Sequence, residues 1–229
     1  MARDETTPVD TPDDKDWTWV LDMTCQECGH DVRTFDREQI GTLIRENARD
    51  WQQVLRRDDG ELRTRPDPNV WSPLEYAAHV RDVYELYDTR LALMLGTDGA
   101  HYPNWDQDDT AVEQNYNAAD PATVATDLLG RAEELATRFD GVDGSQWDRT
   151  GYRSDGAAFT VESFARYLIH DPIHHLWDVG ATYGATHPTT WSRLSAISGQ
   201  GAGGVAQRHL GLVGGIGPHD TVTEVGGDS

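Results

Sequence analysis

The sequence predicts an all-α protein whose centre is a four-helix bundle over residues 36–185. Two observations support this fold class. Four stretches carry apolar residues at the three- and four-residue spacing of an amphipathic helix, and each stretch follows a helix-start signal. These four stretches also hold most of the apolar residues, so the pattern predicts a bundle without a substantial sheet.

The first two helices have the clearest boundaries. Asp36-Arg-Glu-Gln39 resembles a capping box, and the apolar positions that follow continue to Leu55, before Asp58-Asp-Gly60 ends the helix. The second helix begins at Ser72-Pro-Leu-Glu75, where serine caps the helix, proline takes its first position and glutamate its third. This second helix is expected to end at Gly96.

The last two helices follow longer connections. Residues 97–119 are expected to form a loop, which either lines a pocket or serves as a solvated connector. Asp120-Pro121 starts the third helix, which is expected over residues 122–139. Residues 147–159 are expected to form turns and an irregular link, and a fourth helix capped by Thr160 is expected to end near residue 183.

Charge limits the partners that this chain can bind. There are 40 acidic residues against 19 basic ones, and the formal net charge is −21. Such a surface is repelled by nucleic-acid phosphates and by anionic lipids, so neither partner is expected. No apolar run approaches the roughly 18 residues of a spanning helix, and the first residues lack the pattern of a secretory signal. A cytoplasmic location is therefore expected.

The two ends of the chain differ in composition from the centre. Residues 1–16 are rich in Asp, Thr and Pro, and residues 186–229 form a tail rich in Gly. Both segments are expected to be largely disordered, because they cannot bury enough apolar surface to offset the entropy lost on ordering.

Residues 17–35 form an N-terminal extension that holds the only two cysteines, Cys25 and Cys28. A zinc ribbon needs a second Cys-x-x-Cys knuckle, which the sequence lacks, and no βαβ pattern supports a thioredoxin-like role. Three interpretations remain open. The cysteines are a thiol pair with a packing role, half of a site that His30 or another residue completes, or a redox pair.

Nine residues of the predicted fourth helix, His-Asp-Pro-Ile-His-His-Leu-Trp-Asp, contain three histidines and two aspartates. His170 with His174, and Asp171 with His175, stand four residues apart, so each pair could bind one metal ion from successive turns. A third ligand must come from another element, and His79 on the inward face of the second helix is the candidate. The alternatives are a structural polar cluster and, for His79, a buried side chain bonded to a carboxylate.

Two motifs resemble the DinB-like superfamily of four-helix metal proteins, which includes mycothiol-dependent maleylpyruvate isomerases and bacillithiol transferases. They are Trp71-Ser-x-x-Glu-x-x-x-His79-x-x-Asp82 and His170-Asp-x-x-His-His-Leu-Trp-Asp178, in this order. The resemblance covers about residues 36–184 and implies a bundle with up-down-down-up topology.

The same resemblance implies a metal site. In the superfamily the last helix carries a ligand, three other residues and a histidine, with a polar residue three positions further on. Asp178 then sets the register, so that the ligands are His79, Asp171 and His175, with Asp171 standing where the isomerases have glutamate. The other register, with His170 and His174 beside His79, stays open.

A site of this kind implies a divalent metal, Zn²⁺ or Ni²⁺, because imidazole with one carboxylate suits borderline metals. Asp82 and Asp178 are candidates for orienting the ligands from outside. The resemblance further implies a thiol-dependent transferase or isomerase that acts on small electrophilic molecules, with a low-molecular-weight thiol as cosubstrate. A non-catalytic metal-binding stress or structural protein is the alternative. A homodimer is slightly favoured over a monomer.

Overall fold

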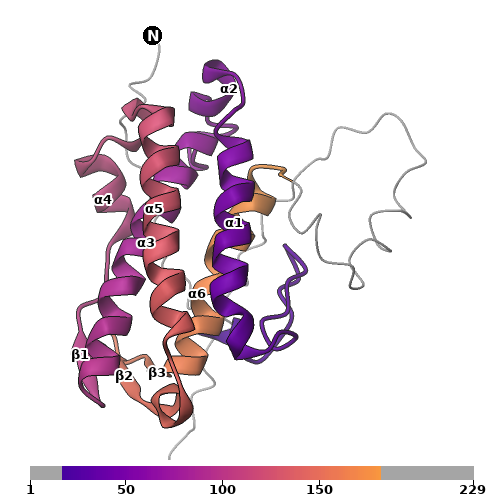
Figure 1. Ribbon diagram of the computed structural model, residues 1–229. Helices are drawn as coiled ribbons and strands as arrows, with labels where there is room; N and C mark the ends of the chain where they lie inside the picture. Colours follow the sequence, from indigo (N-terminus) through magenta and orange to yellow (C-terminus); the bar gives the residue numbers. More distant parts are fainter. Residues whose placement is uncertain (1–16, 182–229) are drawn as a thin grey trace, which may run out of the picture. The chain divides into compact units, whose positions relative to one another are not determined.

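The computed structural model describes residues 17–181, and the predicted all-α four-helix bundle is confirmed. Helix α5 packs against α1 and α3, and α6 contacts the same two helices from the other side (Figure 1). Helices α1 and α3 therefore lie diagonally in the bundle although they follow each other in the chain. The long helices are α1 (Ile40–Val54), α3 (Pro73–Gly96), α5 (Pro121–Asp140) and α6 (Val161–Asp178).

Ion pairs and hydrogen bonds between the helices establish how α1 runs relative to its neighbours. Arg45, near the start of α1, pairs with Asp140 at the end of α5 at 2.8 Å, so these two helices are antiparallel. Arg57, just beyond the end of α1, donates to the Val179 carbonyl oxygen just beyond the end of α6 at 2.9 Å. Helices α1 and α6 are therefore parallel.

The direction of α3 follows from its contacts with α5. Glu85 pairs with Arg131, and Asp88, one turn later in α3, pairs with Arg138 further along α5 at 2.6 Å. The order of the pairs is the same in both helices, so α3 and α5 are parallel. The four helices thus run up, down, down and up.

The predicted start signals are present at the helix termini. Ser72 Oγ accepts a hydrogen bond from the Glu75 amide at 3.3 Å, and the Glu75 carboxylate accepts one from the Ser72 amide at 2.8 Å. Asp120 and Thr160 cap α5 and α6 through their side-chain oxygens. These bonds satisfy first-turn amides that have no partner within the helix.

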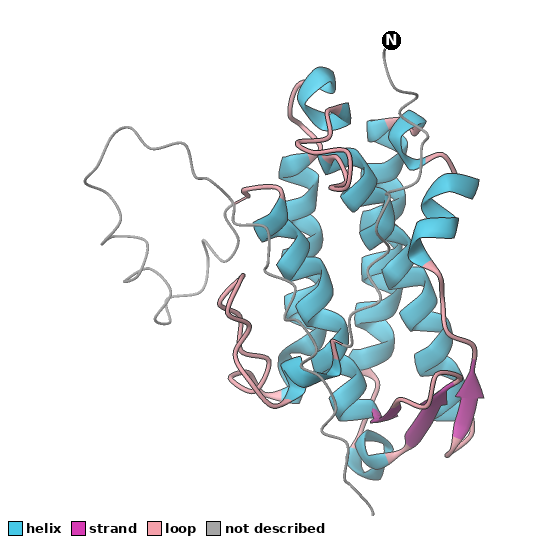
Figure 2. Ribbon diagram, turned by 180° about the vertical axis from the view of Figure 1, so that it is seen from behind, coloured by secondary structure: helices cyan, strands magenta, loops and turns pink. Residues whose placement is uncertain are grey.

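Short elements fill the connections between the helices. Strands β1 (Ala100–Tyr102) and β2 (Thr150–Arg153) pair in parallel, and β2 pairs with β3 (Ala158–Thr160) in antiparallel fashion. Figure 2 shows this small sheet at one end of the bundle. The remaining elements are α2 (Asp59–Arg63), α4 (Gln107–Glu113), η1 (Thr18–Leu21), η2 (Arg37–Gln39), η3 (Tyr116–Ala118) and η4 (Gly144–Asp148).

Several boundaries differ from the sequence predictions. Residues 147–159 are not irregular, since they contribute β2 and the start of β3, and residues 97–119 contain β1, α4 and η3. Strands of three or four residues are too short to produce an alternating pattern, and β1 pairs with a strand about 50 residues away. Helix α6 ends at Asp178, before the expected end near residue 183. Two residues later Gly180 adopts a left-handed φ of 63°, which is common just after the end of a helix.

The N-terminal extension packs along α6. Val20 and Val32 are buried, and η1 contacts α6. The Arg166 guanidinium of α6 donates to the carbonyl oxygens of Val32 and Phe35 at 2.5 and 3.2 Å. The predictions of disorder for residues 1–16 and 186–229 fall outside the described residues. Within the described part, no helix has the length and apolar character that crossing a membrane requires.

Candidate metal centre

His79 is buried at the centre of the bundle. The capping box at Ser72 places it two turns into α3, on the face that packs against the other helices, and none of its surface is exposed. Two indoles pack against its ring. The centroids of His79 and Trp105 are 5.3 Å apart with nearly parallel planes, and Trp71 lies 5.3 Å away on a tilt.

Helix α6 brings Asp171 and His175 to the same point. Asp171 Oδ1 lies 3.4 Å from His79 Nε2 and 3.9 Å from His175 Nε2. One ligand atom from each of the three residues lies within 4.8 Å of the other two. His79, Asp171 and His175 are called the three-ligand site below.

The donor atoms of this site fit a metal ion. Both nitrogens of His79 and Oδ1 of Asp171 are buried without a hydrogen-bond partner among the described residues. Such groups are costly to bury, and an ion bound between His79 Nε2 and Asp171 Oδ1 would satisfy these two atoms. Bonds of about 2.0–2.2 Å at tetrahedral angles separate two ligand atoms by about 3.4 Å, close to the distance between His79 and Asp171.

Asp178 orients one of these candidate ligands. Its Oδ2 accepts a hydrogen bond from His175 Nδ1 at 2.8 Å, which leaves His175 Nε2 directed toward Asp171. Asp82 has a different set of partners. Its carboxylate accepts from Tyr116 OH at 2.5 Å and from Arg81 Nε at 2.7 Å, and neither nitrogen of His79 is bonded to it.

Electrostatics favour the ionised form of Asp171. Burial raises the pKa of its carboxyl group, but the neighbouring His79 and His175 lower this pKa by more than burial raises it, so that it falls to about 2. The side chain is 34 % exposed although Oδ1 is buried, so the rest of the carboxylate faces open space. A deprotonated carboxylate is the form that binds a metal ion.

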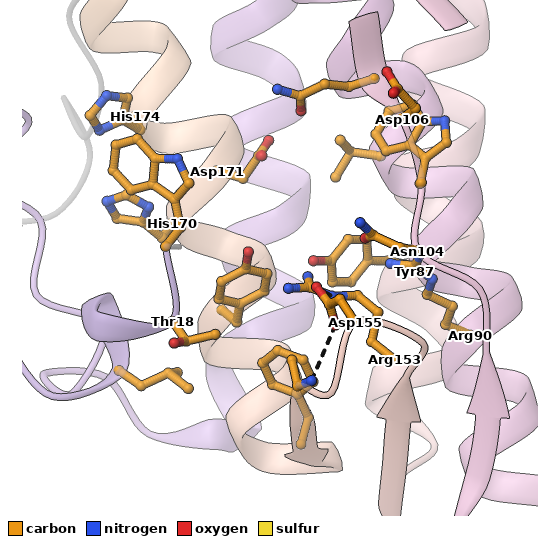
Figure 3. Close-up of a pocket in the computed structure, with 18 of the residues that line it drawn as sticks. Thr18, Tyr87, Arg90, Asn104, Asp106, Arg153, Asp155, His170, Asp171 and His174 are labelled. Atoms are coloured by element: carbon orange, nitrogen blue, oxygen red, sulfur yellow. Dashed lines mark hydrogen bonds and ion pairs between the residues drawn. The ribbon is translucent and has the colours of Figure 1, made fainter. Parts of the chain in front are cut away.

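The three-ligand site opens into a cavity of about 840 Å³. Figure 3 shows Thr18, His170 and His174 on one side of this pocket, Tyr87 and Asn104 on the other, and Asp171 between them. The N-terminal extension, α3, the segment after β1, the β2–β3 turn and α6 all contribute to the lining. A cavity of this size accommodates a small-molecule substrate.

Two arginines of the pocket were not identified from the sequence. Arg153 pairs with Asp155 at 2.8 Å. Arg90 donates to the Pro103 carbonyl oxygen at 2.7 Å, its Nε is buried without a hydrogen-bond partner, and no described carboxylate forms an ion pair with it. Arg90 follows His79 by 11 residues, about three helical turns, so its position on the same face was available as a signal.

The second histidine pair of α6 lies elsewhere. His170 and His174 face Cys25 and Cys28 of the N-terminal extension, and the four residues are called the cysteine cluster below. The alternative triad of His79, His170 and His174 is therefore not assembled. Among the described residues, the side chains grouped with His79 at ligand distance are Asp171 and His175. Burial lowers the pKa of His170 to about 3 and that of His174 in the same direction, which leaves both rings neutral at pH 7.

Comparisons with known proteins agree with this architecture. The family model of the DinB superfamily matches residues 43–179, more than half of the chain. The chain therefore belongs to the DinB superfamily. A comparison with curated proteins found no matching relative.

One solved structure has a similar fold. It is YfiT from Bacillus subtilis, described as a probable metal-dependent hydrolase with an unusual four-helix bundle topology. The TM-score is 0.58 at 17 % sequence identity, and the alignment covers 63 % of this chain and 85 % of YfiT. At this identity the similarity shows the fold.

Proposed function

We propose that this protein is a metal-dependent enzyme whose three-ligand site binds one Zn²⁺ or Ni²⁺, and that it catalyses thiol-dependent transfer or isomerisation of a small electrophilic molecule. One observation carries the proposal: His79 Nε2 and Asp171 Oδ1, two buried ligand atoms without a hydrogen-bond partner among the described residues, meet His175 beside a cavity of about 840 Å³. Three protein ligands leave coordination positions open, which is typical of a catalytic rather than a structural metal site.

The chemistry follows from the site. His79, Asp171 and His175 would hold a divalent metal there, and such a metal would supply Lewis-acid chemistry that lowers the pKa of a small thiol. Asp178 keeps His175 Nε2 directed at the site by accepting from Nδ1. The indoles of Trp71 and Trp105 cover the ring of His79 and exclude water from it. The mycothiol or bacillithiol type of cosubstrate is the part of the proposal that rests on the superfamily resemblance.

Arg90 indicates the charge of the substrate. Its guanidinium lies at the pocket with a buried, unsatisfied Nε and without a carboxylate partner among the described residues. A carboxylate or another small anion on the electrophile or on the thiol would complete its hydrogen bonds. We therefore propose an anionic substrate, bound by Arg90 while the reacting carbon faces the three-ligand site.

Hydrolysis is the second candidate activity. It is favoured by the description of YfiT as a probable metal-dependent hydrolase, and it needs only that water takes the place of the thiol. A metal-binding protein without turnover is the third possibility. We further propose a cytoplasmic location, where a cosubstrate thiol stays reduced, and a homodimer, with neither nucleic acid nor membrane as a partner.

Metal content and activity of paired variants test the proposal. His79→Ala should lose one equivalent of metal and all activity, whereas His101→Ala, an exposed histidine that stacks on Tyr152 in the small sheet, should lose neither. The metal-loaded protein is assayed with low-molecular-weight thiols and anionic electrophiles, and separately for ester and amide hydrolysis. If the protein turned over substrates only in the absence of a thiol, hydrolysis would replace thiol transfer as the proposed activity. Full metal content in His79→Ala would refute the site.

The two registers of α6 are tested in the same way. Asp171→Asn should weaken metal binding at the three-ligand site and abolish activity, because it removes the only anionic ligand. His170→Ala should leave this equivalent of metal in place, since His170 lies in the cysteine cluster. The reverse outcome would assign His170 and His174 to the catalytic metal.

Arg90 has its own test. Arg90→Met keeps much of the side-chain volume and removes the charge, so KM for an anionic substrate should rise at least tenfold while metal content stays at the wild-type level. A neutral analogue of the substrate should show no such rise. Equal effects on both substrates would contradict the proposed anion contact.

A further inference from the structure

The extension and α6 form a second set of metal-binding donors, the cysteine cluster. One ligand atom from each of Cys25, Cys28, His170 and His174 lies within 4.8 Å of the other three. All four residues are buried. No disulfide joins the cysteines. The function proposed above uses none of these four residues as a ligand.

The distances in this cluster are those of a tetrahedral site. Cys25 Sγ lies 3.6 Å from His174 Nδ1, and Cys28 Sγ lies 3.7 Å from His170 Nε2. Zinc–sulfur and zinc–nitrogen bonds of about 2.3 and 2.05 Å at the tetrahedral angle separate the two ligand atoms by about 3.6 Å. Hydrogen bonding alone is a poorer account, because a thiol is a weak donor and neither contact is short.

The spacing within each half is also typical of zinc sites. Two residues separate the cysteines and three separate the histidines, the C-x2-C and H-x3-H spacings of Cys2His2 sites. The cysteines sit on a tight knuckle. The Gly29 amide donates to the Cys25 carbonyl oxygen at 2.9 Å, and Gly29 has a left-handed φ of 73° that a side chain would strain.

A carboxylate supports the cluster from outside. His174 Nε2 lies 3.3 Å from Glu27 Oε2, so the nitrogen that faces away from Cys25 has an anionic partner. Histidine ligands of metals usually donate their other ring nitrogen to such a group, which sets the tautomer. His30, which the sequence offers as a further ligand, instead accepts a hydrogen bond from the Cys25 amide at its carbonyl oxygen and is not in the cluster.

We propose that the cysteine cluster binds one Zn²⁺ as a closed, structural four-ligand site that fastens the N-terminal extension to α6. Each thiol releases its proton to solvent as the metal binds, because the thiolate is the ligand. Four protein ligands fill a tetrahedral shell and leave no position for a substrate, in contrast to the three-ligand site. Successive residues of one helix, α6, thus serve two metals with different roles.

This second metal also shapes the pocket. Trp17, Thr18 and Leu21 of the extension line the cavity together with residues of α6. The Trp17 ring packs on both histidines of the cluster, at centroid distances of 5.6 Å from His170 and 5.1 Å from His174. The structural metal therefore holds one wall of the pocket in place, and losing it should open the cavity to solvent.

Cobalt substitution in the full-length protein tests the site without any mutation. Metal is removed by a chelator under reducing conditions, and Co²⁺ is then titrated in the absence of oxygen. We expect two equivalents per chain, one of which produces a thiolate-to-cobalt charge-transfer band and the strong visible bands of tetrahedral Co²⁺. Cobalt-loaded wild-type protein without the charge-transfer band overturns the proposal. Wild-type protein that is isolated, before reduction, with a Cys25–Cys28 disulfide and no metal also overturns it.

Paired variants assign the band to the cluster. Cys28→Ser should lose the charge-transfer band and one equivalent of metal, while His79→Ala should keep the band and lose the other equivalent. A charge-transfer band that survives in Cys28→Ser at full intensity overturns the proposal. Loss of the band in His79→Ala would do the same, because the two sites would then share one metal.

Hydrogen exchange of the wild-type protein measures the structural role and does not depend on how Cys28→Ser folds. Adding Zn²⁺ to the metal-free protein should slow exchange in residues 17–35 at least tenfold more than in α5, which neither site touches. Equal protection of both segments overturns the structural role. The two proposals fail in distinguishable ways. Wild-type protein that binds metal at the cysteine cluster but not at the three-ligand site contradicts the proposed function. Wild-type protein that binds metal at the three-ligand site but not at the cysteine cluster contradicts this second site.

Discussion

Asp178→Asn should weaken metal binding at the three-ligand site by about 10- to 100-fold, because it changes the partner of a ligand without touching the metal position. The Asp178 carboxylate accepts from His175 Nδ1 at 2.8 Å, and both side chains are less than a fifth exposed. Asparagine keeps the shape of the side chain but removes the negative charge that makes His175 Nε2 a stronger metal ligand. The expected loss corresponds to about 1.4–2.7 kcal/mol of binding free energy.

Asp82→Asn is the matched control. It makes the same chemical change at the other aspartate that the sequence suggested as a supporting residue, but Asp82 accepts from Tyr116 and Arg81 instead of from a ligand. Metal affinity should stay within about twofold of the wild-type value, while the urea midpoint falls because a charged partner of Arg81 is lost.

Competition with a chromophoric chelator measures the affinity, and the cobalt charge-transfer band reports separately on the cysteine cluster. That cluster should respond less, because Asp178 Oδ1 is 3.9 Å from His174 Nε2 while Glu27 is closer, at 3.3 Å. Metal affinity of Asp178→Asn within threefold of wild type would refute the reasoning. An equal loss in Asp82→Asn would show that the effect does not pass through His175.

Three further predictions concern stability. Ser72→Ala should lower the free energy of unfolding by about 0.5–2 kcal/mol in urea titrations, since it removes the cap of α3, and an unchanged midpoint would contradict this. Gly41→Ala should cost about 1–3 kcal/mol, because the added Cβ would lie 3.0 Å from the Ala136 carbonyl oxygen where α1 meets α5; thermal unfolding would show it. Hydrogen bonds from Arg33 hold the pKa of Asp31 well below its ordinary value, so the stability that this pair supplies is present above about pH 4 and lost as the pH falls further. Wild type should therefore lose more stability than Asp31→Asn between pH 5 and pH 3, and parallel losses would contradict the assignment.

Local sequence signals were enough to predict the four helices, and they marked His79 and both residue pairs of α6 as candidate ligands. Caps such as Ser72 and Thr160 act within one turn, so their effect is readable from neighbouring residues. The inward face of His79 and the one-turn spacing of Asp171 and His175 follow from the 3.6-residue period. The superfamily motifs then indicated which pair of α6 would join His79.

The sequence marks each half of the cysteine cluster but does not indicate that the two halves meet. Cys25 and His174 are separated by 149 positions, and no periodic pattern connects an extension to the face of a helix that it will cover. In the sequence the two registers of α6 are alternatives, because His79 is the one partner that helical spacing and the superfamily motifs indicate. In the folded protein adjacent faces of α6 meet different neighbours, so Asp171 and His175 lie beside His79 while His170 and His174 lie beside Cys25 and Cys28.

Amphipathic period and capping chemistry thus specify which residues form helices and which side of each helix is buried, because both depend on residues within a few positions of one another. Contacts across the bundle decide the rest. They bring the short strands β1 and β2 together, place Arg90 at the pocket without a carboxylate partner among the described residues, and set the extension against His170 and His174. Side-chain packing between distant segments determines these arrangements, and each of them depends on where the whole backbone has been placed.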